Sequence, residues 1–502
     1  MRARRRLSPL LAALCFIGGA SLFWVGLGSR GRPPQLIGPN LPIDAERATN
    51  PLDTTATNSP TLVANPRNSN QLAIVSRVDT PQFSCALQIS GDAGATWGGG
   101  SLPVPPGSHS IDCFAPDAAF GADGVLYISF SSIGPVTGQG SVPDAVWVTT
   151  SSDGGHTFGS PVQAGGPLAF QVRLTADSGI PGHVYLVWLQ ATGVSTWGLT
   201  GTENPIVIAR SLDSGMTWSQ PARISAPTRS LVVAPTPVAT DDVLLVAYLD
   251  VGDDRLDYSG AHEGRGGPPY DGPWSIVVAR SADGWNAWSE VTLGNVMPTQ
   301  RFRQLFPPTP ALAVAGSRAY LTFTDASQGD ANVWLWRSTD AGNRWSKGTR
   351  VDDAQKGDQY LPALAIAPSG RVDIIYYDRR GDPDGTQDEV SLQSSFDHGR
   401  RFGHRVRISD RSFDARIGYG SDRGLPELGS RIAVIANDGG ALAIWADTRA
   451  STEATTHQDL ARAVVKAAQA PLARRALMGS GIVVMLAASV LMISSQKLGP
   501  RP

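Results

Sequence analysis

The sequence contains little net charge and very little lysine. Of its 502 residues 17% are charged, the formal net charge at pH 7 is −2, and only four of the 42 basic residues are lysine. Basic runs are confined to the two ends of the chain. Because binding to nucleic acid depends on clustered positive charge, we expect no nucleic-acid partner.

Residues that hold metals or cofactors are also scarce or unsuitably spaced. The seven histidines are scattered, and none stands in a spacing such as H-E-x-x-H. No phosphate-binding loop, dinucleotide fingerprint or G-x-S-x-G motif occurs in a fitting context. The turn from Asp382 to Asp388 has carboxylates at calcium-loop-like spacing, but it lacks the remaining ligands and is more typical of a solvated turn. We therefore expect neither a metal nor a cofactor.

Long uncharged runs occur near both ends of the chain. Residues 7–28 carry no charge and follow arginines at positions 2, 4, 5 and 6, which is typical of a signal anchor or a long signal peptide. Residues 476–495 are uncharged as well and predict a C-terminal transmembrane helix. We expect three parts: a signal segment at 1–30, a folded part at 31–470 on the extracytoplasmic side of the cell membrane, and the membrane helix at 476–495.

Cysteine is rare, with three residues in the chain. Cys15 lies in the first apolar run, and Cys85 and Cys113 lie in the exported part, 28 residues apart. An even pair in an oxidising compartment predicts a disulfide, with two buried thiols as the alternative.

Glycine and proline are abundant, with 55 and 37 residues. They break long helices, while 13 Trp, 10 Tyr and 14 Phe supply material for a core. This composition predicts an all-β protein with many short strands joined by turns.

One pattern, Ser-x-Asp-x-Gly-x-x-aromatic, occurs six times between residues 90 and 402. Its aspartates are Asp92, Asp153, Asp213, Asp283, Asp340 and Asp397, at spacings of 61, 60, 70, 57 and 57 residues. Ser and Asp accept hydrogen bonds from turn amides and Gly adopts positive φ, so the pattern predicts tight hairpin turns with structural carboxylates. The fourth copy has Trp285 in the Gly position, which predicts a distorted turn.

This pattern resembles the Asp-box, or BNR repeat, of sialidases and related β-propellers. The resemblance implies blades of four antiparallel strands, with each box between the third and fourth strand. A second repeat supports it: strand hairpins end at Asp79, Asp250, Asp325, Asp378 and Asp447, and looser copies bring the number of units to seven. The last unit lacks a fourth strand, so residues around 35–43 are expected to close the ring. We favour seven blades; six, as in the resembled sialidases, is the alternative.

The topology places the blade connectors and the loops between second and third strands on the face opposite the boxes, where propellers usually bind ligands. The longest insertion on this face is residues 251–274. Sialidases bind a substrate carboxylate with three arginines and use a tyrosine paired with a glutamate as nucleophile. The resemblance therefore implies a candidate catalytic set: Arg303, Arg379, Arg423, Tyr419 and Glu427. In the alternative interpretation, Asp-Arg pairs at 378–380 and 447–449 brace neighbouring blades through ion pairs.

Two function classes follow. The favoured class is a membrane-anchored propeller that binds a glycan or an envelope protein, because the Phe/Tyr-Arg-Ile-Pro motif of sialidases is absent and the unit count differs from theirs. The alternative is a sialidase-like exo-glycoside hydrolase that releases terminal acidic sugars. Whether the chain is an enzyme stays open at this point.

Overall fold

The computed structural model describes most of the chain. The described residues are 7–28, 34–50, 53–107, 113–136, 140–195, 198–199, 203–240, 243–254, 272–282, 285–298, 308–382, 385–417, 427–451, 455, 457–467 and 480–490. The chain divides into two compact units, one of residues Leu36–Lys466 and one of the two chain ends, Met1–Gln35 with Ala467–Pro502.

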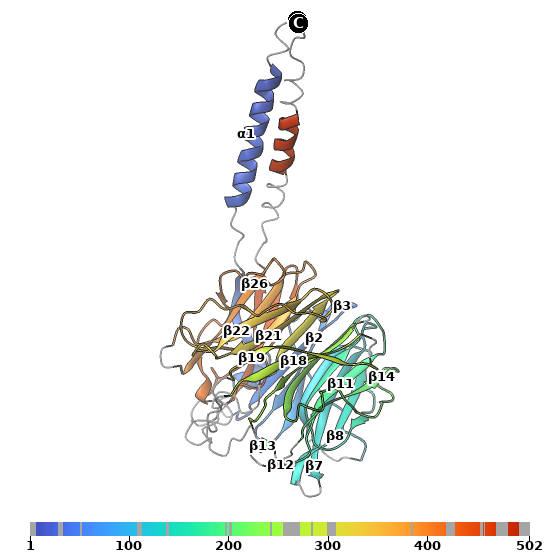
Figure 1. Ribbon diagram of the computed structural model, residues 1–502. Helices are drawn as coiled ribbons and strands as arrows, with labels where there is room; N and C mark the ends of the chain where they lie inside the picture. Colours follow the sequence, from blue (N-terminus) through green and yellow to red (C-terminus); the bar gives the residue numbers. More distant parts are fainter. Residues whose placement is uncertain are drawn as a thin grey trace. The chain divides into compact units, whose positions relative to one another are not determined.

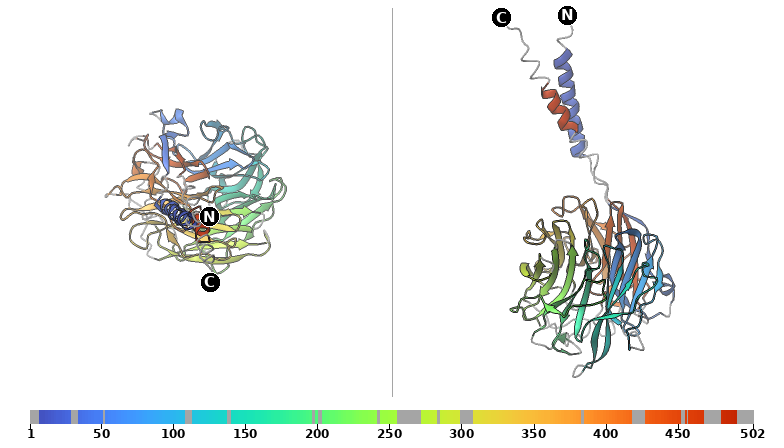
Figure 2. Two further views of the ribbon diagram at one scale, coloured as in Figure 1. Left: turned by 90° about the horizontal axis from the view of Figure 1, so that it is seen from above. Right: turned by 90° about the vertical axis from the view of Figure 1, so that its right-hand side faces the viewer.

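Among its described residues, the larger unit contains seven blades, each built on four antiparallel strands and arranged around a common axis as in a β-propeller (Figures 1 and 2). The prediction of seven blades is thus confirmed, and the alternative of six is wrong. The innermost, first strands of blades 1 to 7 are β2 (Thr57–Asn65), β6 (Cys113–Phe120), β10 (Ala169–Ala176), β16 (Val232–Thr240), β20 (Ala311–Ala315), β24 (Gln359–Ile366) and β29 (Ala433–Asn437).

The remaining strands follow in the same blade order. The second strands are β3 (Asn68–Val78), β7 (Leu126–Val136), β11 (Val184–Gln190), β17 (Val243–Asp250), β21 (Arg318–Asp325), β25 (Val372–Asp378) and β30 (Gly440–Asp447). The third strands are β4 (Ser84–Ser90), β8 (Gly140–Ser151), β14 (Ile206–Ser211), β18 (Trp274–Ser281), β22 (Asn332–Ser338), β26 (Gln387–Ser395) and β31 (Asp459–Lys466). The fourth strands are β5 (Gly98–Gly100), β9 (Val162–Gly165), β15 (Ala222–Arg223), β19 (Ser289–Val296), β23 (Thr349–Arg350), β27 (Val406–Arg407) and β1 (Gln35–Pro42).

The described residues of this unit also form a few short elements outside the four-stranded blades. They are the pair β12 (Val194–Ser195) and β13 (Gly198–Leu199), β28 (Phe413–Asp414) beside β26, the helix α2 (Ala45–Ala48) and the 3-10 turn η2 (Ala415–Ile417).

The ring closes as expected through the N-terminal strand. Blade 7 has the order β1, β31, β30, β29, and the backbone N–H of Ile43 donates to the carbonyl of Leu460 at 2.8 Å. The first strands of blades 1 and 7 also pack against each other. Pairing the first and the last strand of the propeller within one sheet leaves no open edge between the first and last blade.

The second strands form the middle of the core because each is covered on both faces by the neighbouring blades. All seven residues of β25 are buried, and β17 is buried except at its last residue. Such strands read as continuous apolar runs rather than alternating ones. The largest fully buried side chains include Trp188 in β11 and Trp445 in β30.

The repeated Ser-x-Asp turns connect third to fourth strands on one face, called here the box face; the opposite face, where the first strands begin, is the connector face. In the first turn, Ser90 Oγ accepts from the N–H of Gly94 at 2.9 Å, and Asp92 accepts from the N–H and the Oγ1 of Thr96 at 2.8 and 2.6 Å. The bonds from Thr96 and Ser90 hold the pKa of Asp92 at about 2. This carboxylate is therefore a turn-forming group.

The two bonds from backbone N–H groups recur in the turns of Asp153, Asp213, Asp340 and Asp397. Asp283 lies outside the described residues, so the predicted distortion of its turn stays a prediction.

The smaller unit contains the helix α1 (Leu7–Gly28) and a second helix at 480–490. The two helices approach closely, since a Cβ on Gly19 would lie 2.9 Å from the carbonyl oxygen of Gly481. Among the described residues, no helix has both the length and the hydropathy needed to cross a membrane. The two predicted membrane segments therefore stay predictions.

Candidate ligand-binding site

Five first strands carry a bulge near the connector face. Their backbone has positive φ at Ser59, Ala115, Gln171, Ala234 and Leu361. The strand pairing shifts register at the same places, and the first residues paired beyond the shift are Thr61, Asp117, Arg173, Thr236 and Ala363. A bulge bends its strand and redirects the side chains that follow. These residues therefore occupy equivalent positions around the axis.

Side chains from four consecutive blades meet here in a chain of polar contacts. Arg431, before β29 of blade 7, donates from Nε to Thr61 Oγ1 of blade 1 at 3.1 Å. Thr61 donates to Asp117 Oδ1 of blade 2 at 2.5 Å, and Asp117 Oδ2 lies 2.9 Å from Arg173 Nε of blade 3. These four residues are called the arginine arc.

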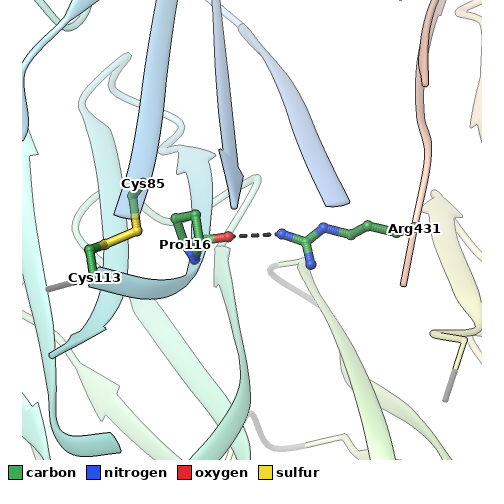
Figure 3. Close-up of a disulfide and its surroundings, with 4 residues drawn as sticks. All are labelled: Cys85, Cys113, Pro116 and Arg431. Carbon is green, nitrogen blue, oxygen red and sulfur yellow. Dashed lines mark hydrogen bonds between the residues drawn. A yellow bond between two sulfur atoms is a disulfide. The ribbon is translucent and has the colours of Figure 1, made fainter. Parts of the chain in front are cut away.

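Within the arc, both oxygens of the Asp117 carboxylate already accept hydrogen bonds, whereas some guanidinium N–H groups have no acceptor among the described residues. Asp117 is 1% exposed and also accepts from the N–H of Leu174 at 2.8 Å. Among the described residues, Arg173 Nη1 is buried without a hydrogen-bond partner. Arg431 donates from Nη2 to the carbonyl of Pro116 at 2.8 Å (Figure 3). Within the described ranges, no carboxylate pairs with Arg431 and no partner is found for its Nη1.

The charge around Arg431 is unusual for an arginine. Burial lowers its pKa to about 9, and the nearby cations Arg173 and Arg77 lower it as well, against the opposing effect of Asp117. Arg431 nevertheless keeps part of its surface exposed. A guanidinium that lies close to other cations and has no carboxylate as an ion-pair partner would be stabilised by a bound anion.

A second ion-pair group lies beside the arc. Arg77, at the end of β3, contacts Asp79 at 2.7 Å and Glu427 at 2.6 Å, and all three side chains are buried. Although burial opposes it, the two carboxylates raise the pKa of Arg77. Asn58 Nδ2 donates to Asp79 at 2.7 Å. This group joins blade 1 to the connector that enters blade 7.

The segment before Arg431 is fixed by contacts to two other blades. The N–H of Ser430 donates to Ser59 Oγ of blade 1 at 3.0 Å, and its carbonyl accepts from the N–H of Thr309, at the start of blade 5, at 3.1 Å. Gly429 has φ +92°, and a Cβ there would lie 2.6 Å from Ser59 N. Glycine is therefore required where the chain turns into Arg431.

The catalytic set predicted from the sequence is not brought together by the described residues. Arg303, Tyr419 and Arg423 lie outside them. Arg379 donates to Asp388 from Nε at 2.8 Å and from Nη2 at 3.0 Å, and it is 4% exposed. Its Nη1 donates to the carbonyl of Gly385. Arg379 is thus occupied by its own loop, and Glu427, the other described residue of the set, pairs with Arg77.

The repeated Asp-Arg pairs form ion pairs between a blade and the connector that enters it. Arg380 contacts Asp378 of its own blade and Asp353 of the preceding connector, at 2.7 and 2.5 Å. Arg449 likewise contacts Asp447 and Asp410. These geometries fit the bracing role considered in the sequence interpretation.

Cys85 and Cys113 form a disulfide in the structure (Figure 3). It links the third strand of blade 1 to the first strand of blade 2, and it lies on the side of Pro116 opposite Arg431. Cys15 is free and exposed.

Sequence reasoning missed Arg77, Arg173 and Arg431, together with Asp79 and Asp117. A signal for two of them was present: Asp117 and Arg173 stand where other first strands have Thr61, Thr236 or Ala363. A charged residue at a position where the other blades have a small or uncharged residue indicates a role other than packing within the blade.

Comparisons with known proteins bear on the fold. No family model matches the chain, and no curated protein matches it in sequence. Among solved structures, a polysaccharide lyase of a new family, an ulvan lyase, is similar with a TM-score of 0.51 and 12% identity, covering 85% of this chain and 98% of that one. A Hadza microbial sialidase has a TM-score of 0.42 and 13% identity, with 78% and 73% covered. An α-L-arabinofuranosidase of Fusarium graminearum has a TM-score of 0.41 and 14% identity, with 73% and 97% covered. The ulvan lyase, with a TM-score above 0.5, thus shares the overall fold of this chain.

Proposed function

We propose that the propeller binds a carboxylate-bearing saccharide at the arginine arc. The observation that carries this proposal is that Arg431, beside the second cation Arg173, has no carboxylate partner among the described residues. Within the part of the chain that the structure describes, Arg173 Nη1 is buried without a hydrogen-bond partner, and no hydrogen bond from Arg431 Nη1 is found. A carboxylate has two acceptor oxygens and can accept from both arginines at once.

Binding is supported over catalysis by the state of the central carboxylates. Asp117 is held by Arg173 and Thr61, and both Asp79 and Glu427 are held by Arg77. A general acid or nucleophile needs a group that is available to the substrate. Glycoside hydrolysis is the second candidate, favoured by the position of Glu427 beside the arginines.

The saccharide class is proposed from the fold, which the polysaccharide lyase shares. The proposed location is the extracytoplasmic side of the cell membrane, with the uncharged helix α1 as an anchor. Fractionation of cells that express the chain would test this location, and recovery of the full-length chain from the aqueous phase would contradict it.

The binding proposal is tested by calorimetric titration of the full chain with glucuronate, N-acetylneuraminate and, as a neutral control, glucose. We expect an acidic sugar to bind and glucose to give no heat. Arg431→Met should weaken binding about tenfold or more, because a charge-assisted hydrogen bond contributes about 1.5–3 kcal/mol. Arg67→Met, at an exposed arginine on another part of blade 1, is the matched control and should bind normally.

Equal affinity of wild type and Arg431→Met, or no binding of any acidic sugar, would overturn the proposal. The same samples are incubated with fluorogenic glycosides of both acids. Turnover that disappears in Glu427→Gln would favour the hydrolase instead.

A further inference from the structure

We propose that the Cys85–Cys113 disulfide is a positioning element of the arginine arc, so that the affinity for the acidic ligand depends on whether this bond is formed. The inference rests on the proposed function and concerns the regulation of that same site. It is separate from the general stabilising effect that a disulfide has on a fold.

The bond joins the two segments that hold the central arginines. Cys85 in β4 is paired directly across from Arg77 in β3. Cys113 begins β6, three residues before Pro116, whose carbonyl binds Arg431. Figure 3 shows the disulfide on one side of Pro116 and Arg431 on the other. A shift of Cys113 relative to blade 1 therefore displaces the acceptor of Arg431.

The pairing of β6 with β7 is interrupted between Cys113 and Asp117. Cys113 and Phe114 pair with β7, but pairing resumes only at Asp117, so the intervening residues, Ala115 and Pro116, are not paired with that strand. Ala115 has φ +50°. The direction of the Pro116 carbonyl consequently depends on how the residues before the bulge are held.

Phe114 connects the same two segments from the other side. Its ring lies 5.6 Å from Arg77 Cζ and makes an edge contact with Phe83 at 5.5 Å. Cation and ring attract each other in this arrangement. The disulfide and the contacts of the Phe114 ring together hold the start of β6 against blade 1.

The bond is open to exchange from one end. Cys113 is 0% exposed, whereas Cys85 is partly exposed. A thiolate of a small dithiol can attack Cys85 Sγ, which forms a mixed disulfide and releases Cys113 as a thiolate that takes up a proton. The second thiol of the reagent then displaces Cys85, so two electrons pass to the protein and the reagent leaves as its cyclic disulfide.

The test uses the full chain with Cys15→Ser, so that the disulfide pair holds all remaining cysteines. Glucuronate affinity is measured by calorimetry for oxidised, dithiothreitol-reduced and reoxidised protein, at temperatures where circular dichroism shows the reduced form folded. We expect reduction to weaken binding about fivefold or more, as for loss of a well-aligned hydrogen bond, and reoxidation to restore it. The variant Cys85→Ala/Cys113→Val should bind glucuronate with the affinity of the reduced protein, and dithiothreitol should not change that affinity.

Each failure has its own meaning. If the oxidised protein does not bind, the proposed function fails. If it binds and thiol counting shows complete reduction with unchanged affinity, the positioning role is overturned, even where the melting temperature falls. Should the dithiothreitol-reduced protein not fold, the Cys85→Ala/Cys113→Val variant takes its place: unchanged affinity there would also overturn the role, and weakened affinity would support it.

Discussion

Arg77 and Glu427 are 350 residues apart in the sequence and form a buried ion pair, with 2.6 Å between Nη2 and Oε1. Removing two charges from water is costly unless both find partners, and here Asp79 supplies a third charge. The pair joins the first blade to the connector of the last. The centre of the ring is therefore held together by residues from both ends of the folded chain.

The first prediction concerns Gly429. Gly429→Ala should weaken the binding of acidic sugars, because a Cβ at φ +92° and 2.6 Å from Ser59 N forces Ser430 and Arg431 to move. Calorimetric titration and thermal unfolding measure the two effects. Gly38→Ala is the control: Gly38 has φ +70° but nothing within 4 Å of its added Cβ, so only the backbone cost of about 1–2 kcal/mol is expected. Normal ligand binding by Gly429→Ala would contradict the role assigned to this turn.

A second prediction separates Arg379 from Arg431. Arg379→Met should lower the free energy of unfolding by about 3–5 kcal/mol, because it leaves Asp388 buried without its cation. Its affinity for acidic sugars should stay that of the wild type. Chemical denaturation gives the first quantity and calorimetry the second.

The double variant Arg379→Met/Asp388→Leu is the control, and it should recover part of the lost stability because no unpaired charge remains. Loss of ligand binding in a stably folded Arg379 variant would contradict this prediction and indicate that Arg379 takes part in the ligand site.

The third prediction is a pH dependence at the ring closure. His457 is 2% exposed; its Nε2 lies 2.7 Å from Asp459, and its Nδ1 faces the carbonyl of Asp53 at 3.1 Å. Burial alone would lower the pKa of His457, but Asp459 and Asp53 raise it. Burial also raises the pKa of Asp459.

A histidine whose pKa is raised on folding stabilises the fold below its unfolded pKa of about 6.5 and loses this contribution as pH rises through the folded value. The unfolding free energies of wild type and His457→Gln should therefore differ most below about pH 6.5 and converge at higher pH. His404→Gln, at an exposed histidine, is the control and should leave the profile unchanged. A difference that grows with pH would contradict the assignment.

The seven-bladed fold could be predicted because each blade has its own local sequence motifs. Each Ser-x-Asp turn carries its own hydrogen-bonding groups, so a reader of the sequence can place it without knowing its neighbours. Counting hairpins gave seven blades, and the missing fourth strand of the last blade pointed to residues 35–43, where β1 is found.

The candidate site could not be predicted in the same way because its contacts run between blades. Arg431 binds the backbone carbonyl of Pro116, and no side-chain pattern reports such an acceptor. Arg379 was placed in the correct loop, but only coordinates show that Asp388, nine residues later, turns back to occupy it. Convergence depends on the order of blades around an axis, which a one-dimensional pattern does not contain.

The closing strand β1 has a consequence for biosynthesis. β1 is synthesised before every other strand of the propeller, whereas its partner β31 is synthesised last. Until β31 arrives, β1 and the outer edge of the unfinished last blade both present unpaired N–H and C=O groups, and pairing over so long a loop is slow. A chain interrupted before β31 would therefore carry two open edges that invite pairing with other chains. Completion of the last strand is thus the step at which the nascent protein stops being prone to aggregation.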